Sequence, residues 1–197
     1  MTLLYATILS MTLSFFAWMN LLQNYNKGLA AHQAGDYDTA LKEWRPLAEQ
    51  GNAITQYNLA LMYNNGEGIA EDNVEAAKWY QRAAEQGYAS AQNNLGNMYY
   101  NGEGVAEDFT QAVKWYRKAA EQGHTEAQSN LGFMYDNGEG VAEDDTEAVK
   151  WWRLAAEQGD AVAQSNLGLK YAQGEGVSQD YSESIRWWRL AAEQGNT

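Results

Sequence analysis

The sequence predicts an all-α solenoid, an array of antiparallel helix pairs that repeats every 36 residues. The string AAEQG ends at Gly87, Gly123, Gly159 and Gly195, which are 36 residues apart. Within each step, apolar residues recur at helical spacing in two stretches separated by a glycine-containing loop. No proline-rich or low-complexity tract separates the steps. We therefore expect one continuous array.

The repeat divides the chain into an apolar N-terminal segment, an opening unit and four full units. The opening unit lacks the NGEGVAE loop, so we expect a shorter turn there. The N-terminal segment covers residues 1–22, the opening unit 23–51, and the full units 52–87, 88–123, 124–159 and 160–195.

The N-terminal segment is apolar and long. Residues 3–22 contain no charged side chain, and the first one in the chain is Lys27. About 20 such residues can cross a bilayer as a helix, and the core of a secretory signal is also apolar. No Lys or Arg precedes the run, and no clear cleavage site follows. Three interpretations stay open: a cleaved signal peptide, a membrane anchor formed by residues 3–22, or a helix packed on the fold (or a misplaced start).

The first helix of each full unit is typified by SAQNNLGNMYYNG. Ala91, Leu95, Met98 and Tyr99 fall at i, i+4, i+7 and i+8, which gives one apolar stripe. Gly96 lies in the middle of this helix, where glycine costs about 1 kcal/mol relative to alanine. Because later units repeat this glycine, we expect a neighbouring helix, and a large aromatic side chain, to approach closely.

The second helix is typified by DFTQAVKWYRKAAEQG. Asp108 is placed to cap its N-terminus, and Gly123 ends it. Trp115 and Tyr116 form an aromatic pair that recurs in every full unit beside small alanines. A carbohydrate-binding platform is one interpretation of such pairs. Recurrence at core-like spacing favours packing between helices.

The acidic stretch MYDNGEGVAEDD between the two helices raises the question of a calcium or catalytic site. A calcium loop that started at Asp136 would have Gly138 at its third position, where a ligand side chain is needed. Glu139 and Glu143 recur in other units, whereas an active site is normally single. Glycines allow left-handed backbone in a tight turn. The stretch is therefore expected to be a corner between helices.

Composition excludes several classes of function. The formal net charge is −13 and the pI about 4.5, which argues against binding of nucleic acid, since phosphates need clustered Lys and Arg. There is no cysteine, and only two histidines occur. A thiolate or imidazole metal site and a Ser–His–Asp triad are thus not expected. The sequence predicts no enzyme, no cofactor and no metal.

These units resemble the Sel-one-like repeat family, a relative of the tetratricopeptide repeats. The resemblance rests on AQNNLGNMYYNGEGVAEDFTQAVKWYRKAAEQG and its three sibling strings, and it spans the four full units. It implies a right-handed superhelix and the role of an adaptor that holds other proteins. Many bacterial members are exported. Together with the apolar N-terminal segment, this favours a periplasmic or membrane-anchored location.

Function is expected at positions that differ between units, because shared positions build the scaffold. Tetratricopeptide-like proteins bind on the concave face, which the first helices line. Carried over to this chain, that geometry predicts a groove for a protein or peptide segment, with Tyr100 and Phe133 as apolar anchors. The groove has no basic residue, so a neutral or basic segment is expected. Its residues are Tyr57, Leu61, Asn64, Asn65, Asn93, Asn97, Tyr100, Asn101, Ser129, Phe133, Asp136, Asn137, Ser165, Leu169, Ala172 and Gln173.

Two other functions stay open. The array could be a structural spacer or an oligomerising element. In that case Ile185, Trp188 and Leu190 of the last unit, which no further helix covers, would dock against a second copy, a partner or a further segment. An enzyme or binder of cell-wall peptide or β-lactam is the other alternative. The relatives linked to such ligands are stapled by disulfides, which a chain without cysteine cannot form.

Overall fold

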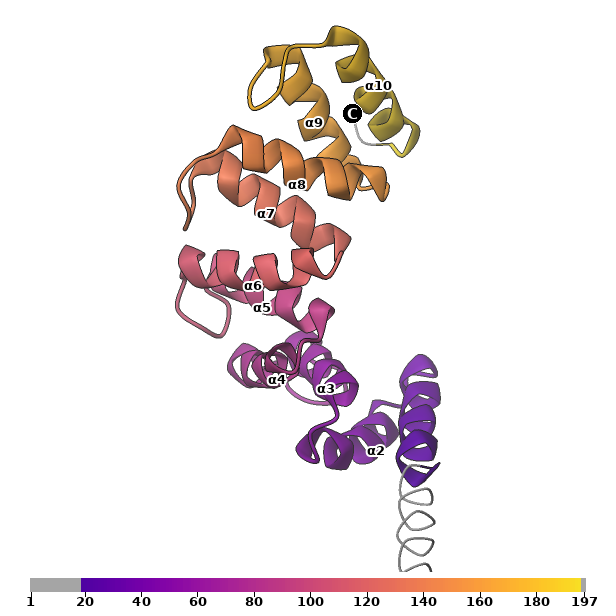
Figure 1. The fold of residues 1–197 in the computed structure, drawn as a ribbon. Helices are drawn as coiled ribbons and strands as arrows, with labels where there is room; N and C mark the ends of the chain where they lie inside the picture. The colour runs from indigo at the N-terminus through magenta and orange to yellow at the C-terminus, as the bar shows by residue number, and fades with distance from the viewer. Residues whose placement is uncertain (1–18, 196–197) are drawn as a thin grey trace, which may run out of the picture. The chain divides into compact units, whose positions relative to one another are not determined.

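The computed structural model describes residues 19–195, and these residues are helical with no strand (Figure 1). Consecutive helices pack against each other as pairs, so the predicted all-α solenoid of helix pairs is confirmed. Residues 19–33 form the first described helical stretch. The later helices are α2 (Tyr37–Glu49), α3 (Ala53–Asn65), α4 (Asn73–Glu85), α5 (Ala89–Asn101), α6 (Phe109–Glu121), α7 (Thr125–Asn137), α8 (Asp145–Glu157), α9 (Ala161–Gln173) and α10 (Tyr181–Glu193).

The chain divides into two compact parts, Met1–Ala83 and Ala84–Thr197. In the N-terminal part, Trp44 of α2 is buried against the helix over residues 19–33. Its indole Nε1 donates to the backbone oxygen of Tyr25 at 3.2 Å. A Cβ on Gly28 would clash with the indole ring of Trp44, so glycine lets the two helices approach. Trp44 therefore holds α2 against the helix over residues 19–33 in the opening unit.

Most of the apolar N-terminal segment lies outside the described residues, which include only its last four positions. Of these, Met19, Leu21 and Leu22 are exposed. Within residues 19–195, no helix combines the length and apolar character needed to span a bilayer. The three interpretations of residues 3–22 stay predictions.

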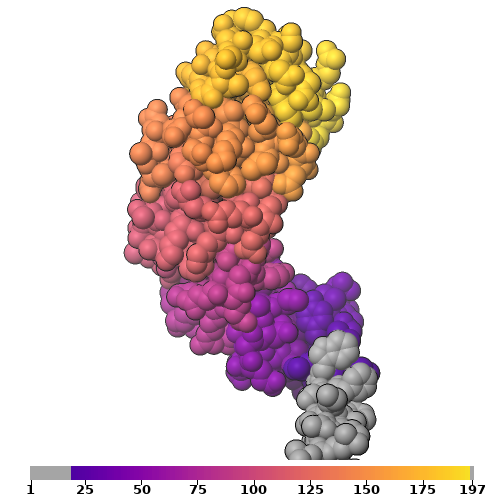
Figure 2. All heavy atoms as spheres, viewed as in Figure 1, coloured from indigo at the N-terminus to yellow at the C-terminus, as the bar shows by residue number. Residues whose placement is uncertain are grey.

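In the C-terminal part, helices α5 to α10 share one apolar core. The space-filling view shows the surface of this part, with its units following one another in chain order from magenta to yellow (Figure 2). Helix pairs pack within a unit, as α7 with α8, and also between units, as α6 with α7. Each mid-helix glycine faces an aromatic ring of its own unit. A Cβ on Gly132 would lie 2.6 Å from Trp152, and one on Gly96 would lie 2.6 Å from Tyr116. The predicted close approach of a large aromatic side chain is confirmed.

The acidic stretch after α7 forms a corner. Gly138 ends the helix with φ of 67°, in the left-handed region. The backbone N–H of Asp144 then returns to the carbonyl of Tyr135 at 3.0 Å, which closes the loop. Asp144 caps α8 by accepting from the N–H groups of Thr146 and Glu147. Aspartate at this position satisfies backbone donors at the helix start that would otherwise lack partners.

Candidate functional site

A pocket of about 260 Å³ opens between α5, α6 and α7 in the C-terminal part. Two of its residues come from α5, one from α6 and three from α7, so it spans two consecutive units. Its lining residues are Asn97, Tyr100, Tyr116, Asn130, Phe133 and Met134.

Tyr116 of α6 forms the inner wall of the pocket. Later units carry Trp152 or Trp188 at this position, and their indole N–H groups donate to a backbone carbonyl of the same unit. The smaller ring of Tyr116 instead extends its hydroxyl to Asn97 Oδ1 at 2.8 Å. Burial raises the pKa of Tyr116, so the hydroxyl keeps its proton and donates at neutral pH. The pocket therefore depends on a tyrosine at a position where the two following units carry tryptophan.

Two asparagines form the polar floor. Asn130 Nδ2 donates to Asn93 Oδ1 at 3.2 Å and to Asn97 Oδ1 at 3.3 Å. With these contacts made, Asn97 Nδ2 and Asn130 Oδ1 have no hydrogen-bond partner among residues 19–195. One is a donor and the other an acceptor. That combination is complementary to the C=O and N–H groups of a peptide backbone.

Aromatic rings form the outer wall. The Tyr100 ring lies 5.4 Å from that of Phe109 and meets Phe133 edge to face, with centroids 6.2 Å apart. Phe133 remains 41% exposed. The pKa of Tyr100 is raised, first by its partial burial and then by the carboxylate of Glu139 nearby. The pocket thus has an apolar wall, a polar floor and an acidic edge.

The structure brings only some of the predicted groove residues together. Asn97, Tyr100 and Phe133 all line the pocket. Asn93 and Ser129 are buried instead, and Ser129 Oγ donates to Asp160 Oδ1 at 3.0 Å. Both therefore serve contacts inside the array in this structure.

The remaining α5, α7 and α9 positions lie outside the pocket. Asn101, Asn137 and Gln173 are exposed at helix ends, where Asn137 Nδ2 donates to the carbonyl of Phe133 at 2.9 Å. On α9, Leu169 is exposed, and Ser165 and Ala172 are half-buried. The groove as a whole stays a prediction.

The predicted α3 positions belong to the N-terminal part. Tyr57 and Leu61 are half-buried, and Tyr57 has its ring 5.8 Å from that of Tyr80. Asn64 Nδ2 donates to Asn73 Oδ1 at 2.7 Å, and Asn65 Nδ2 donates to Glu67 Oε1 at 3.2 Å. These side chains make local contacts.

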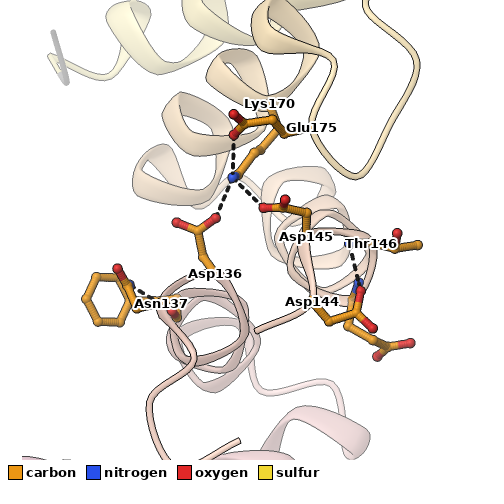
Figure 3. Close-up of polar contacts among 9 residues, drawn as sticks. Asp136, Asn137, Asp144, Asp145, Thr146, Lys170 and Glu175 are labelled. Atoms are coloured by element: carbon orange, nitrogen blue, oxygen red, sulfur yellow. Dashed lines mark hydrogen bonds and ion pairs between the residues drawn. The ribbon is translucent and has the colours of Figure 1, made fainter. Parts of the chain in front are cut away.

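Asp136, another predicted groove residue, is part of a charged cluster between α7, α8 and α9 (Figure 3). Lys170 Nζ lies 2.6 Å from Asp136 Oδ1, 2.6 Å from Asp145 Oδ1 and 2.9 Å from Glu175 Oε2. The Lys170 side chain is only 9% exposed. An ammonium group occupies the space among these carboxylates. Within the described chain, no three His, Cys, Asp or Glu side chains are grouped as metal ligands.

Sequence reasoning missed Lys170, although a signal was present. The three preceding units carry methionine at this position, and all three methionines are buried. A lysine at a position that is buried in the other units, together with acidic residues at the positions that face it, indicates a cluster of ion pairs between two units. One unit earlier the corresponding side chains are apolar or aromatic apart from the shared glutamate: Tyr100, Phe109, Met134 and Glu139.

Comparison with known proteins identifies the family. The profile described as Sel1 repeat matches residues 53–88, 89–124, 125–160 and 161–196. The chain belongs to the Sel1 repeat family. Sel1 repeat proteins are in general non-catalytic scaffolds that mediate protein–protein interaction.

Solved structures of Sel1 repeat proteins are similar to this one. A protective antigen of uropathogenic Escherichia coli with an SLR fold is 48% identical, with a TM-score of 0.77 over 79% of this chain and 33% of that chain. A Sel1 repeat protein from Oxalobacter formigenes is 38% identical, with a TM-score of 0.81 over 85% of this chain and 69% of that one.

One curated relative carries a functional name. An exopolysaccharide production negative regulator of Rhizobium meliloti is 40% identical over 53 residues, which are 27% of this chain and 20% of the regulator. The chain thus spans a third of the E. coli antigen and a fifth of the regulator.

Proposed function

We propose that this Sel1 repeat protein is a non-catalytic adaptor that binds an extended peptide segment of a partner protein at the pocket between α5 and α7. The observation that carries the proposal is the pairing of a free amide donor and a free amide acceptor, Asn97 Nδ2 and Asn130 Oδ1, beside the exposed ring of Phe133. An extended peptide offers the complementary groups: a backbone C=O, a backbone N–H and a side chain.

The pocket also limits the chemistry of the segment. A volume of about 260 Å³ accommodates one apolar side chain against the rings of Tyr100 and Phe133. The carboxylate of Glu139 lies beside Tyr100, and the chain as a whole carries a net charge of −13. A segment with a basic residue next to its apolar anchor suits this surface better than an acidic one, because opposite charges favour encounter and orientation.

The unit-specific origin of the pocket supports a recognition role. Asn97 replaces the larger apolar side chains found at this position in the other full units, Leu61, Phe133 and Leu169. Tyr116 replaces the tryptophan of the two following units and is shared with the first full unit, which carries Tyr80. The exchange that introduces Asn97 is not needed to build the scaffold. Buried aromatic anchors with nearby polar groups are typical of the residues that dominate binding energy.

The test is a crosslinking pull-down from native extract with wild-type protein and the Asn97→Ala/Tyr100→Ala/Phe133→Ala variant. The matched control is Leu154→Ala/Val162→Ala, which removes exposed apolar side chains outside the pocket. All three proteins must show the same helical circular-dichroism signal. Loss of a partner in the pocket variant alone supports the proposal, whereas equal capture by all three contradicts it.

We also propose that the protein is exported and reaches its partner in the periplasm or at the membrane. The support is the uncharged run of residues 3–22. Cell fractionation of full-length protein and of a version without residues 1–22 tests this. Recovery of both in the cytoplasmic fraction would contradict export.

A further inference from the structure

A glutamate recurs in the corner after the first helix of every full unit, as Glu67, Glu103, Glu139 and Glu175. In three of the four corners a side-chain nitrogen lies within hydrogen-bond distance of it. His32 Nε2 lies 2.8 Å from Glu67 Oε2, and Asn101 Nδ2 donates to Glu103 Oε1 at 3.3 Å. Lys170 Nζ lies 2.9 Å from Glu175 Oε2. No such nitrogen within residues 19–195 meets Glu139, whose Oε2 is buried without a hydrogen-bond partner.

The third and fourth of these corners are built alike. A Cβ on Gly140 would clash with the backbone of Phe109, and one on Gly176 would clash with the backbone of Asp145. Phe109 and Asp145 are the first residues of α6 and α8. Each corner therefore rests on the start of the preceding unit's second helix, and its glutamate occupies an equivalent place.

The surroundings of the glutamate differ between these two corners. The two aspartates beside Lys170 are replaced one unit earlier by Tyr100 and Phe109, whose ring centroids are 5.4 Å apart. Lys170 itself is replaced by the buried Met134. The faces of aromatic rings attract cations. The earlier junction thus keeps a carboxylate and gains aromatic rings, while its own unit supplies no ammonium group at the lysine position.

The pocket between α5 and α7 opens beside this carboxylate. Tyr100 and Phe133 line the pocket. Partial burial raises the pKa of the Tyr100 hydroxyl, and the nearby carboxylate of Glu139 raises it further. The last torsion of a glutamate side chain is soft, so the carboxylate can turn an oxygen toward the pocket. A long side chain that enters along the two rings then brings its end to Glu139.

We propose that the residue anchored in this pocket is a lysine of the partner segment. This inference rests on the proposed function and names its anchor. The aliphatic stem lies against the rings of Tyr100 and Phe133, and the ammonium group pairs with Glu139. One lysine side chain thus supplies both the apolar contact and the positive charge that this surface favours. The equivalent space in the next junction holds an ammonium group, which is more compact than the planar guanidinium of arginine.

The test uses two acetylated and amidated peptides, Gly-Ser-X-Ser-Gly, in which X is lysine or norleucine. Norleucine keeps the aliphatic stem and lacks the ammonium group. NMR titrations of ¹⁵N-labelled full-length protein follow the side-chain amide signals of Asn97 and Asn130, which line the pocket. The variant Glu139→Gln removes the charge with little change in shape. Its matched control, Glu143→Gln, removes a charge from an exposed position of the same corner.

We expect the lysine peptide to bind wild-type protein about tenfold more tightly than the norleucine peptide, the effect of one hydrogen bond to a charged group. Glu139→Gln should abolish this preference by weakening the lysine peptide alone. Glu143→Gln should keep the preference, because the net charge of the protein changes equally in both variants.

Three results would overturn the inference: no saturable binding of the lysine peptide, equal affinity of both peptides for wild-type protein, or an equal loss of preference in both variants. The proposed function has its own outcome. If both peptides bind equally, and both are lost with Asn97→Ala/Tyr100→Ala/Phe133→Ala, the pocket remains a peptide site whose anchor is apolar. Equal capture in the pull-down, in contrast, contradicts the proposed function itself.

Discussion

Lys170 shows how one side chain sets the character of a junction between units. Its ammonium group contacts Asp136, Asp145 and Glu175, and only 9% of its side chain is exposed. Its long apolar stem occupies the space of a methionine, and its charge is matched by carboxylates on α7, α8 and the loop after α9. Removing one partner of such a cluster lowers the free energy of unfolding by more than the intact cluster contributes to it, because the remaining charges lose their counter-ion.

Lys170→Met should therefore lower the free energy of unfolding by about 2 kcal/mol, less than for a fully buried pair because the three carboxylates are partly exposed. Urea unfolding followed by circular dichroism measures it. The control adds Asp136→Tyr and Asp145→Phe, which recreates the side chains of the preceding junction and should recover most of the loss. An unchanged midpoint for Lys170→Met would show that the cluster contributes nothing.

Gly132 is required by the ring of Trp152. An added Cβ would lie 2.6 Å from Trp152, so Gly132→Ala should destabilise the protein by about 2 kcal/mol despite the higher helix propensity of alanine. Thermal unfolding measures the loss. The first full unit carries Ala60 and Tyr80 at these positions. Adding Trp152→Tyr should thus restore part of the stability, and no restoration would argue against the steric explanation.

His124 makes the start of α7 sensitive to pH. Its Nδ1 accepts from the N–H of Ala127 at 3.3 Å, and burial lowers its pKa below the ordinary value of 6.5. The folded state therefore favours the neutral ring. This cap stabilises the fold above about pH 6.5, and the stabilisation is lost as the pH falls through the lowered pKa, because a cation at a helix N-terminus is unfavourable.

The expected result is a fall of about 1 kcal/mol in unfolding free energy from pH 7.5 to below the lowered pKa, relative to His124→Asn. Asparagine caps α3 at the same position through Asn52, so the variant keeps the cap without the titration. Urea titrations of both proteins across this pH range measure the difference. Parallel pH profiles would contradict the assignment.

At the scale of elements, neighbouring units are matched at their junctions. Between α5–α6 and α7 the facing residues include the aromatic pair Tyr100 and Phe109. Between α7–α8 and α9 they are Asp136, Asp145 and Lys170. The backbone repeats while the junction chemistry changes. The free energy of unfolding therefore depends on the order of the units, which would not be so if all units and their junctions were identical.

Deleting residues 124–159 tests this matching. The deletion keeps the 36-residue register but places Lys170 opposite Tyr100 and Phe109, which offer no carboxylate. We expect a folded but weakened array, which Lys170→Met in the same background should stabilise by about 2 kcal/mol. The unfolding midpoints of the deletion protein with and without Lys170→Met measure this difference. Lys170→Met destabilises the full-length protein, so a change of sign between backgrounds is the expected signature. Destabilisation in both would show that the junctions are not matched.

At the scale of the whole molecule, the negative net charge favours cationic partner segments over phosphate backbones. A net charge of −13 repels phosphate backbones and attracts cationic segments. We expect no retardation of duplex DNA or RNA in gel shifts at low salt. A basic protein of similar size serves as the positive control. Retardation that disappears as salt is raised would contradict the assignment of a protein partner.

Much of the fold could be predicted from the sequence because a repeat presents each signal several times. The 36-residue step and the aspartate cap recur in all four full units, and the glycine opposite an aromatic ring recurs in three, so each signal is read several times. The candidate site was only partly predictable. Asn97, Tyr100 and Phe133 stand out as variable residues, but nothing in the pattern shows that Asn93 faces inward while Asn97 lines a pocket.

The sequence alone determined the repeat length, the two helices of each unit and the corner between them, because these depend on local periodicity, capping and glycine. Tertiary structure alone decided which variable side chains meet. Tyr116 reaches Asn97 and Lys170 reaches Asp136 across contacts of 19 and 34 residues in sequence. The first contact depends on how the two helices of one unit pack and the second on how one unit packs on the next, and local periodicity fixes neither geometry.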